Sequence, residues 1–269
     1  MPRFETVSFL SDYGLTDEFV GVCKAVIRRI APHVTVLDIC HELAPHDVRA
    51  GSLALARAAQ YLPSGVVLGV VDPGVGGARR AVAVEGADGE SYFVGPDNGL
   101  LASAVAMTGG AGRAVSLTNE EYQLPAPGPT FAGRDIFAPA AAYLCSDVDL
   151  FELGESIDPL SLLPGILPLS RAEDGKLVGE VLWVDRFGNV QLNVDPEELD
   201  ALGEAITMRF ADQVRTAVRA TTYDELGPGQ IGLVIDSYGL VSVALARRSA
   251  ADELRLQAPT EVSLEPASG

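Results

Sequence analysis

Apolar residues follow two spacings in the first half of the chain. Short runs rich in β-branched side chains predict strands at residues 5–11, 34–39, 66–72, 80–86 and 91–95. Apolar residues at helical spacing predict helices at residues 18–31, 48–61, 99–107 and 135–145. Because strands alternate with helices, we expect an α/β domain with a mostly parallel sheet and flanking helices.

The pattern changes after residue 150. Residues 158–170 contain three prolines and keep no period, which is typical of a linker. Further on, short β-rich runs are separated by glycines and Asp-Pro pairs, and they include KLVGEVLWVD, NVQLNV, ITMRF, IGLVID, LVSVALA and EVSLE. They predict a smaller all-β, barrel-like or sandwich domain. The expected boundaries are an α/β domain at 1–160, a linker at 161–176 and the β domain at 177–269.

Composition narrows the class of protein. A hydrophobic fraction of 48% with 21% charged residues is that of a globular chain, not a disordered one. The net charge of -18, with only 19 Lys and Arg, argues against a nucleic-acid partner, and the acidity is most simply a solvated surface. No signal peptide and no apolar window of membrane-spanning length is visible. Three cysteines without CxxC spacing indicate reduced thiols, so we expect a cytoplasmic protein.

Two acidic residues follow predicted strands of the sheet, where open α/β sheets bind ligands. Asp12 follows the first strand, and its carboxylate can accept hydrogen bonds from vicinal ribose hydroxyls; a helix cap or turn role is the alternative. Asp72 opens the segment VDPGVGGARR, in which glycines allow close backbone approach and Arg79 can reach back to Asp72. The segment is not a P-loop, because no Gly-Lys-Ser/Thr follows it. A tight turn between two strands is the alternative interpretation.

Other polar clusters carry weaker signals. His41, Glu42, His46 and Asp47 resemble metal ligands, but their spacing differs from HExxH, and loop and helix-cap roles are favoured. No G-x-S-x-G elbow is present, so a serine hydrolase of that type is not indicated. We expect no metal and no cofactor.

Later turns carry further polar residues. In TFAGRD, residues 130–135, Arg134 and Asp135 can simply pair with each other. In the β domain, two glycine-containing turns hold Asp185, Phe187, Asn189, Ser237 and Tyr238. Taken singly, each of these segments predicts only a turn.

Seven motifs in order resemble a known family. FLSDYGLTDEFVG, LDICHELAPHDVRAG, VVDPGVGGARR, FVGPDNGLL, TFAGRDIFAPAAA, VDRFGNVQLN and DSYGLVSVA are similar to segments of the S-adenosyl-L-methionine hydroxide adenosyltransferases. These enzymes are the water-using relatives of those that fluorinate or chlorinate the same substrate. The resemblance covers nearly the whole chain. It implies hydrolysis of S-adenosylmethionine to adenosine and methionine by a homotrimer, with each site between one subunit's N-terminal domain and a neighbour's barrel.

The resemblance also implies roles for single residues. Asp72 and Arg79 match two members of an Asp-Arg-His set that handles the attacking water. The implied substrate contacts are Asp12 for the ribose hydroxyls, Asp185, Phe187 and Asn189 for the nucleoside and methionine, and Ser237 and Tyr238 for the methionine carboxylate.

The third member of the set is missing. The family motif reads Thr-Phe-His-Gly-Arg-Asp, whereas this chain has Ala132 at the position of the histidine. Alanine cannot hydrogen-bond through its side chain or move a proton, so the substitution predicts slower turnover with binding retained. The intact flanking residues favour a disabling substitution over natural divergence.

Two other functions remain open. A protein that binds S-adenosylmethionine or adenosine without turnover would need the same motifs. A halide-using alkyl transferase is the other, but the negative charge of Asp72 opposes a bound halide. Against that, Ala132 leaves space next to Arg79 for a water or small anion. A metal-dependent hydrolase is the least favoured alternative.

Overall fold

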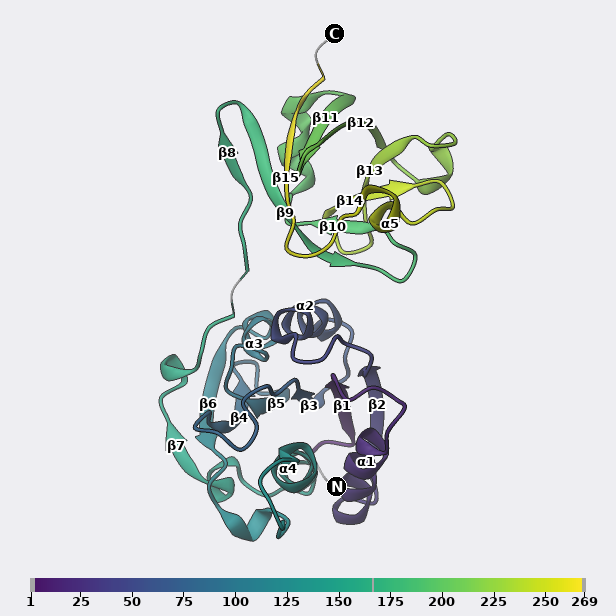
Figure 1. Cartoon of the computed structure of the whole chain (residues 1–269). Coiled ribbons are helices and arrows are strands. Elements are labelled where there is room, and N and C mark those ends of the chain that lie inside the picture. Colours follow the sequence, from purple (N-terminus) through teal and green to yellow (C-terminus); the bar gives the residue numbers. More distant parts are fainter. Residues whose placement is uncertain (1–2, 166, 268–269) are drawn as a thin grey trace. The chain divides into compact units, whose positions relative to one another are not determined.

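The computed structural model describes residues 3–165 and 167–267 and contains two compact units, Met1–Ile166 and Leu167–Gly269 (Figure 1). Each unit has its own buried apolar clusters. Strand β8, Arg171–Glu173, lies within the segment expected to be a linker and pairs with β9, Lys176–Val184, of the second unit.

The first unit is built on a seven-stranded sheet in the order β2-β1-β3-β5-β4-β6-β7. Its strands are β1 (Thr6–Ser11), β2 (Thr35–Cys40), β3 (Gly65–Val70), β4 (Ala81–Gly86), β5 (Ser91–Pro96), β6 (Ala111–Ser116) and β7 (Glu155–Ile157). Strands β2, β1, β3 and β5 are parallel, whereas β4 runs antiparallel to β5 and β6. The expected parallel-rich sheet is confirmed, and its buried strands match continuous apolar runs such as that of β3.

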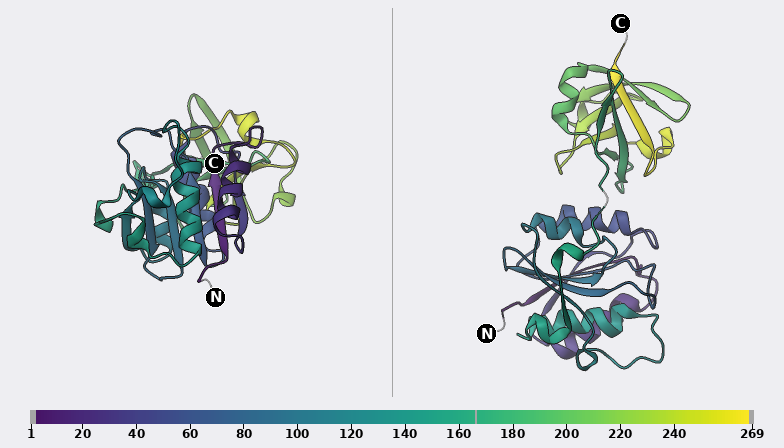
Figure 2. Two further views of the ribbon diagram at one scale, coloured as in Figure 1. Left: turned by 90° about the horizontal axis from the view of Figure 1, so that it is seen from below. Right: turned by 90° about the vertical axis from the view of Figure 1, so that its left-hand side faces the viewer.

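Helices cover both faces of this sheet (Figures 1 and 2). They are α1 (Phe19–Ile30), α2 (Val48–Ala59), α3 (Ala102–Met107) and α4 (Ala138–Cys145). Helices α1 and α4 pack together on one face, and α2 and α3 pack on the other. Helix α1 buries Val20, Cys23 and Ile27, which lie on one side of a helix. A π-helical turn, Gly133–Phe137, leads directly into α4.

The second unit is a closed β-barrel, as expected. Its strands are β9, β10 (Val190–Leu192), β11 (Ala205–Phe210), β12 (Gln213–Ala220), β13 (Ile231–Ile235), β14 (Val241–Leu245) and β15 (Glu261–Pro266), and a short helix, α5 (Ala250–Leu254), precedes β15. Strand β10 pairs with both β14 and β9, which closes a ring of seven strands, while β8 adds to the outside edge of β9. Closure removes unpaired sheet edges, and alternate side chains fill the interior.

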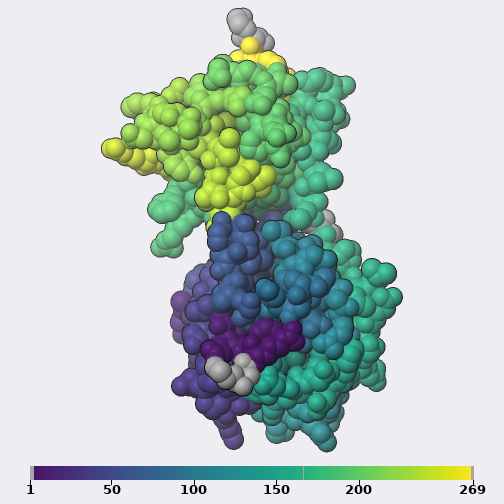
Figure 3. All heavy atoms as spheres, turned by 180° about the vertical axis from the view of Figure 1, so that it is seen from behind, coloured from purple at the N-terminus to yellow at the C-terminus, as the bar shows by residue number. Residues whose placement is uncertain are grey.

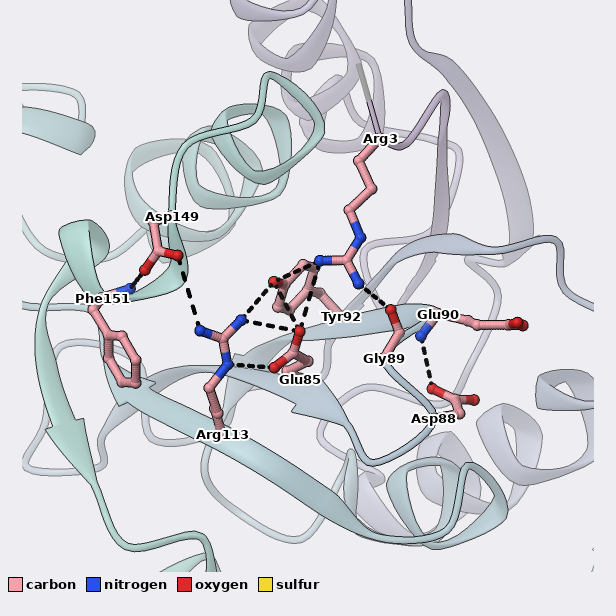
Figure 4. A network of polar contacts seen from close by, with 9 residues as sticks. All are labelled: Arg3, Glu85, Asp88, Gly89, Glu90, Tyr92, Arg113, Asp149 and Phe151. Carbon is pink, nitrogen blue, oxygen red and sulfur yellow. Dashed lines mark hydrogen bonds and ion pairs between the residues drawn. The ribbon is translucent and has the colours of Figure 1, made fainter. Parts of the chain in front are cut away.

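A network of hydrogen bonds and ion pairs lies at the amino-terminal edge of the parallel strands (Figure 4). The Glu85 carboxylate at the end of β4 accepts hydrogen bonds from the Arg113 guanidinium and, at 3.2 Å, from the Tyr92 hydroxyl. Arg3 lies 3.7 Å from the same carboxylate. The hydrogen bonds from Arg113 lower the pKa of Glu85. The network therefore ties the start of the chain to three strands.

The first described residues lie on the surface of the first unit. Figure 3 shows them in purple beside segments from later in that unit, and the Arg3 backbone N–H donates to Asp147 Oδ1 at 2.9 Å. Among the described residues, no helix is long and apolar enough to cross a bilayer.

Candidate active site

Asp12 and Asp72 lie at the same edge of the sheet. They follow β1 and β3, which are adjacent and parallel with Ser11 opposite Val70, and the Asp12 backbone N–H donates to the Val70 carbonyl at 3.3 Å. Helix α1, which follows β1, and helix α2, which precedes β3, lie on opposite faces of the sheet. This is the place where open α/β sheets form a ligand crevice beyond the strand ends.

Asp72 and Arg79 form a forked ion pair, as the sequence suggested. Arg79 Nε lies 3.0 Å from both carboxylate oxygens of Asp72, and Nη2 lies 2.5 Å from Oδ2. The side chains are 6% and 15% exposed, so the pair is largely out of water. The Arg79 guanidinium also lies 5.3 Å from the centre of the Phe137 ring. Such a pair holds the Asp72 carboxylate in a fixed orientation.

The loop between the two residues needs its glycines. A Cβ at Gly74 would lie 3.2 Å from Arg79 Cγ and 3.8 Å from Asp72 Oδ1, so a side chain there would crowd the pair. Gly76 has a φ of 74°, which favours glycine. Strands β3 and β4, which flank the loop, are separated in the sheet by β5, so the loop is not a hairpin turn.

Ala132 and Arg79 both line an open cavity of about 830 Å³. The residue is 5% exposed and immediately precedes the π-helical turn. In that turn Arg134 pairs with Asp135 at 2.5 and 2.9 Å, as expected from their sequence positions. The cavity, which Arg79 also lines, therefore has room for a side chain larger than alanine at position 132.

Of the four metal-like residues between 41 and 47, Asp47 caps helix α2. Its side chain accepts a hydrogen bond from the Ala50 backbone N–H at 2.8 Å, which confirms the helix-cap interpretation. The His46 backbone N–H donates to Asp12 Oδ2 at 2.8 Å, so this segment orients the Asp12 carboxylate. In the described part of the chain, no group of three or more His, Cys, Asp or Glu side chains is arranged to hold a metal.

In the barrel, the turn after β9 is organised by Asp185. Its carboxylate accepts hydrogen bonds at 2.8 Å from the backbone N–H groups of Phe187 and Asn189 and from the Asn189 side chain. Gly188 has a φ of 83°. The Phe187 ring is 80% exposed. The turn thus presents an aromatic ring outward on a fixed backbone.

The turn that contains Ser237 and Tyr238 lies close to it. Its organiser is Asp236, which accepts hydrogen bonds from the Tyr238 and Leu240 backbone N–H groups. Gln191, on the strand β10 that follows the Asp185 turn, donates to Asp236 at 2.6 Å. The Tyr238 ring also lies 6.3 Å from the Trp183 ring of β9, centre to centre, so this turn contacts both strands that flank the Asp185 turn.

Three residues near these two turns were not predicted from the sequence. Asp236 organises the second turn and accepts a hydrogen bond from the buried Gln191. Burial, together with the charges of Asp185 and Asp236, raises the pKa of Tyr223. Asp236 could have been found from the Asp-x-x-Gly turn spacing in DSYG, because Asp commonly accepts backbone hydrogen bonds in such turns. Nothing in the sequence alone marks Gln191 or Tyr223.

Comparison with known proteins decides the family. The SAM hydroxide adenosyltransferase N-terminal domain matches residues 7–154, and the C-terminal domain of the same family matches residues 179–263. The chain belongs to the SAM hydroxide adenosyltransferase family. Within this family, the chain is 44% identical over 248 residues to a protein of Salinispora tropica named (R)-S-adenosyl-L-methionine hydrolase, covering 92% of this chain and 93% of the relative.

Other relatives extend the comparison. A hydrolase of the same name from Thermus thermophilus is 42% identical, with 96% and 98% of the two chains covered, and a fluorinase from an Actinoplanes species is 29% identical, with 91% of each covered. An uncharacterized conserved protein from Thermotoga maritima has a similar solved structure, with a TM-score of 0.87, 35% identity, and 96% and 99% of the chains covered. The family match spans both units of this chain, so both contribute to the comparison.

Proposed function

We propose that this chain hydrolyses S-adenosyl-L-methionine to adenosine and L-methionine. The observation that carries the proposal is the buried Asp72–Arg79 fork at the strand edge beside Asp12. The names of the Salinispora and Thermus relatives support the same reaction, with the (R) form of the sulfonium as substrate.

The reaction is a nucleophilic substitution at the ribose C5′. The oxygen of water forms a bond to C5′ while the C5′–S bond breaks, and sulfur keeps the electron pair. The sulfonium becomes a neutral thioether, so the leaving group needs no proton. The proton lost by the attacking water passes to Asp72 or onward to solvent. The protein must therefore hold water in line and favour its hydroxide character.

Each residue at the strand edge has a distinct task in this mechanism. Asp12 accepts hydrogen bonds from the ribose hydroxyls and fixes C5′. Asp72 orients the water and accepts its proton, and Arg79 holds the Asp72 carboxylate in place. The carboxylate charge disfavours a halide nucleophile, which supports water as the reactant.

We further infer that the protein is a homotrimer and that the barrel of another subunit completes each substrate-binding site. In this arrangement Asp185, Phe187 and Asn189 contact the nucleoside and methionine, and Ser237 and Tyr238 bind the methionine carboxylate. The hydrogen bond from Gln191 to Asp236 and the contact between the Trp183 and Tyr238 rings support this assignment. The three unpaired cysteines support a reducing compartment, the cytoplasm.

Ala132 favours one second candidate, a protein that binds the substrate or adenosine with little turnover. A positioned histidine base typically contributes roughly 10²–10⁴-fold to a rate, and this chain has a methyl group at that position. The cavity beside Ala132 leaves room for the missing ring.

The decisive test compares the protein with its Ala132→His variant. Each is incubated with S-adenosylmethionine, and adenosine and methionine are quantified by chromatography. We expect measurable release by the parent and a rate increase of at least about tenfold in the variant. Equal rates would refute the role given to position 132. Binding without release by either protein would favour the second candidate, and 5′-halo-adenosine formed only with chloride or fluoride would indicate a halide transferase.

A further inference from the structure

A chain of hydrogen-bonded polar side chains lies next to Asp12, in which Ser11 and His41 are buried and Asp38 and Lys24 are partly exposed. His41, which is 4% exposed, bonds through Nδ1 to the Ser11 hydroxyl at 2.7 Å and through Nε2 to Asp38 Oδ1 at 3.0 Å. Lys24 on α1 donates to the other oxygen of Asp38 at 2.6 Å. The chain thus runs from the surface of α1 to the residue that precedes Asp12.

The hydrogen bonds define the direction of the chain. Burial opposes ionisation of Asp38, but the hydrogen bonds from Lys24 and His41 outweigh it and lower the pKa of Asp38. The Asp38 carboxylate therefore accepts from Nε2–H of His41. In the neutral imidazole Nδ1 is then an acceptor, and the Ser11 hydroxyl donates to it.

This order of residues resembles a Ser-His-Asp triad, but it cannot work as one. Ser11 is fully buried, so its hydroxyl cannot reach a substrate carbon. This hydrogen-bonded chain of side chains must therefore have a role other than activating Ser11 as a nucleophile.

His41 holds the backbone on both sides of Asp12. Its ring packs edge-on against Phe9, with centres 4.7 Å apart, and bonds to Ser11 before Asp12. Its carbonyl accepts the Gly14 N–H at 2.7 Å after Asp12. A register shift between β1 and β2, at Phe9 and Leu10, precedes this contact, and such irregularities re-aim the residues that follow.

The same segment then reaches the carboxylate itself. Five residues after His41, the His46 backbone N–H donates to Asp12 Oδ2, which leaves Oδ1 to accept from a ligand. His46 has a φ of 70°, an uncommon conformation for a residue other than glycine, so the surrounding contacts must hold it. His41 is the buried first residue of this segment, and its contacts fix where the segment begins.

We propose that His41 is a positioning residue that holds the Asp12 carboxylate in the orientation required by the ribose hydroxyls of the ligand. The proposal rests on the proposed function, because it takes Asp12 to be the ribose contact. His41 acts through Ser11, Gly14 and the segment to His46, and it does not touch the reacting atoms. Its loss therefore weakens nucleoside binding more than it slows the chemical step.

The test uses the full chain and adenosine as the probe. His41→Phe keeps an aromatic ring against Phe9 but removes both side-chain hydrogen bonds. Calorimetry should show adenosine binding about tenfold weaker than in the parent. In S-adenosylmethionine hydrolysis, KM should rise by a similar factor while kcat stays within about twofold. His41→Gln, which restores one donor and one acceptor, should recover part of the affinity.

His33→Phe is the matched control. His33 also makes a hydrogen bond, at 3.1 Å to the Cys145 carbonyl, and among the described residues it has no hydrogen bond to Asp12 or to the residues beside it. We expect parent-like adenosine affinity in this variant, with folding of all variants checked by circular dichroism. Parent-like affinity in His41→Phe would overturn the proposal, as would a parent protein that binds no adenosine. Adenosine binding that depends on His41, without any hydrolysis by the parent or Ala132→His, would sustain it and refute only the proposed reaction.

Discussion

Separating Asp72 from Arg79 should destabilise the first unit. Arg79→Gln leaves the Asp72 carboxylate, 6% exposed, without its cationic partner. Breaking a buried pair from one side costs about 3–5 kcal/mol, and the 15% exposure of Arg79 favours the lower end, about 3 kcal/mol. For a unit of this size that corresponds to a fall in Tm of roughly 6–12 °C.

The neutral double variant separates charge burial from loss of contacts. Asp72→Asn combined with Arg79→Gln leaves no buried charge and allows an amide-to-amide hydrogen bond. The double variant should lose less stability than Arg79→Gln and Asp72→Asn lose together as single variants, by more than about 1 kcal/mol. Hydrolysis should be lost in all three variants, because the carboxylate, its partner or both are gone.

The two units offer separate signals for this measurement. The longer helices belong to the first unit, so circular dichroism at about 222 nm follows its unfolding. Trp183, the single tryptophan of the chain, lies on β9 of the barrel, and its fluorescence serves as the internal control. Parent-like stability of Arg79→Gln, or strictly additive losses in the double variant, would refute the buried-pair reasoning.

Two further variants test packing and charge in the first unit. A Cβ at Gly133 would overlap the Tyr13 hydroxyl, so Gly133→Ala should lower the free energy of unfolding, measured by thermal unfolding, by about 1–3 kcal/mol. The loss should be smaller in a Tyr13→Phe background, which lacks this hydroxyl, and equal losses in both backgrounds would contradict the reasoning. The pKa of Glu85 is lowered from 4.5, so its ion pair with Arg113 stabilises the fold above that pH and is lost as pH falls. The stability difference between parent and Glu85→Gln, from urea unfolding, should therefore shrink between about pH 5 and pH 3, and a constant difference would exclude this cause.

Strands with apolar runs were predictable because burial on both faces leaves a clear pattern. Strand β3, predicted at 66–72, is found at Gly65–Val70, and β13, within IGLVID, at Ile231–Ile235. Strand β12, with the sequence QVRTAVRA, was missed, because its arginines and exposed positions hide the alternation. The π-helical turn before α4 was also missed, since apolar spacing does not reveal a widened hydrogen-bond pattern.

The candidate site was predictable where neighbours in space are also close in sequence. The Asp72–Arg79 pair closes over a short glycine-rich loop, so its contact could be expected from the residues alone. The link from Gln191 to Asp236 joins β10 to the turn after β13, and the contact of His41 with Ser11 joins the loop after β2 to β1. Neither could be predicted, because both depend on how the strands are ordered in the fold.

The exposed ring of Phe187 has an entropic consequence. Because Asp185 already fixes the backbone of its turn, a ligand that packs on the ring needs to restrict only two side-chain torsions. That costs about 0.5–1.5 kcal/mol. Ordering a free five-residue loop would instead cost roughly 5–10 kcal/mol, at 1–2 kcal/mol per residue. By fixing the turn, Asp185 therefore lowers the entropy cost of any contact that the Phe187 ring makes with a ligand.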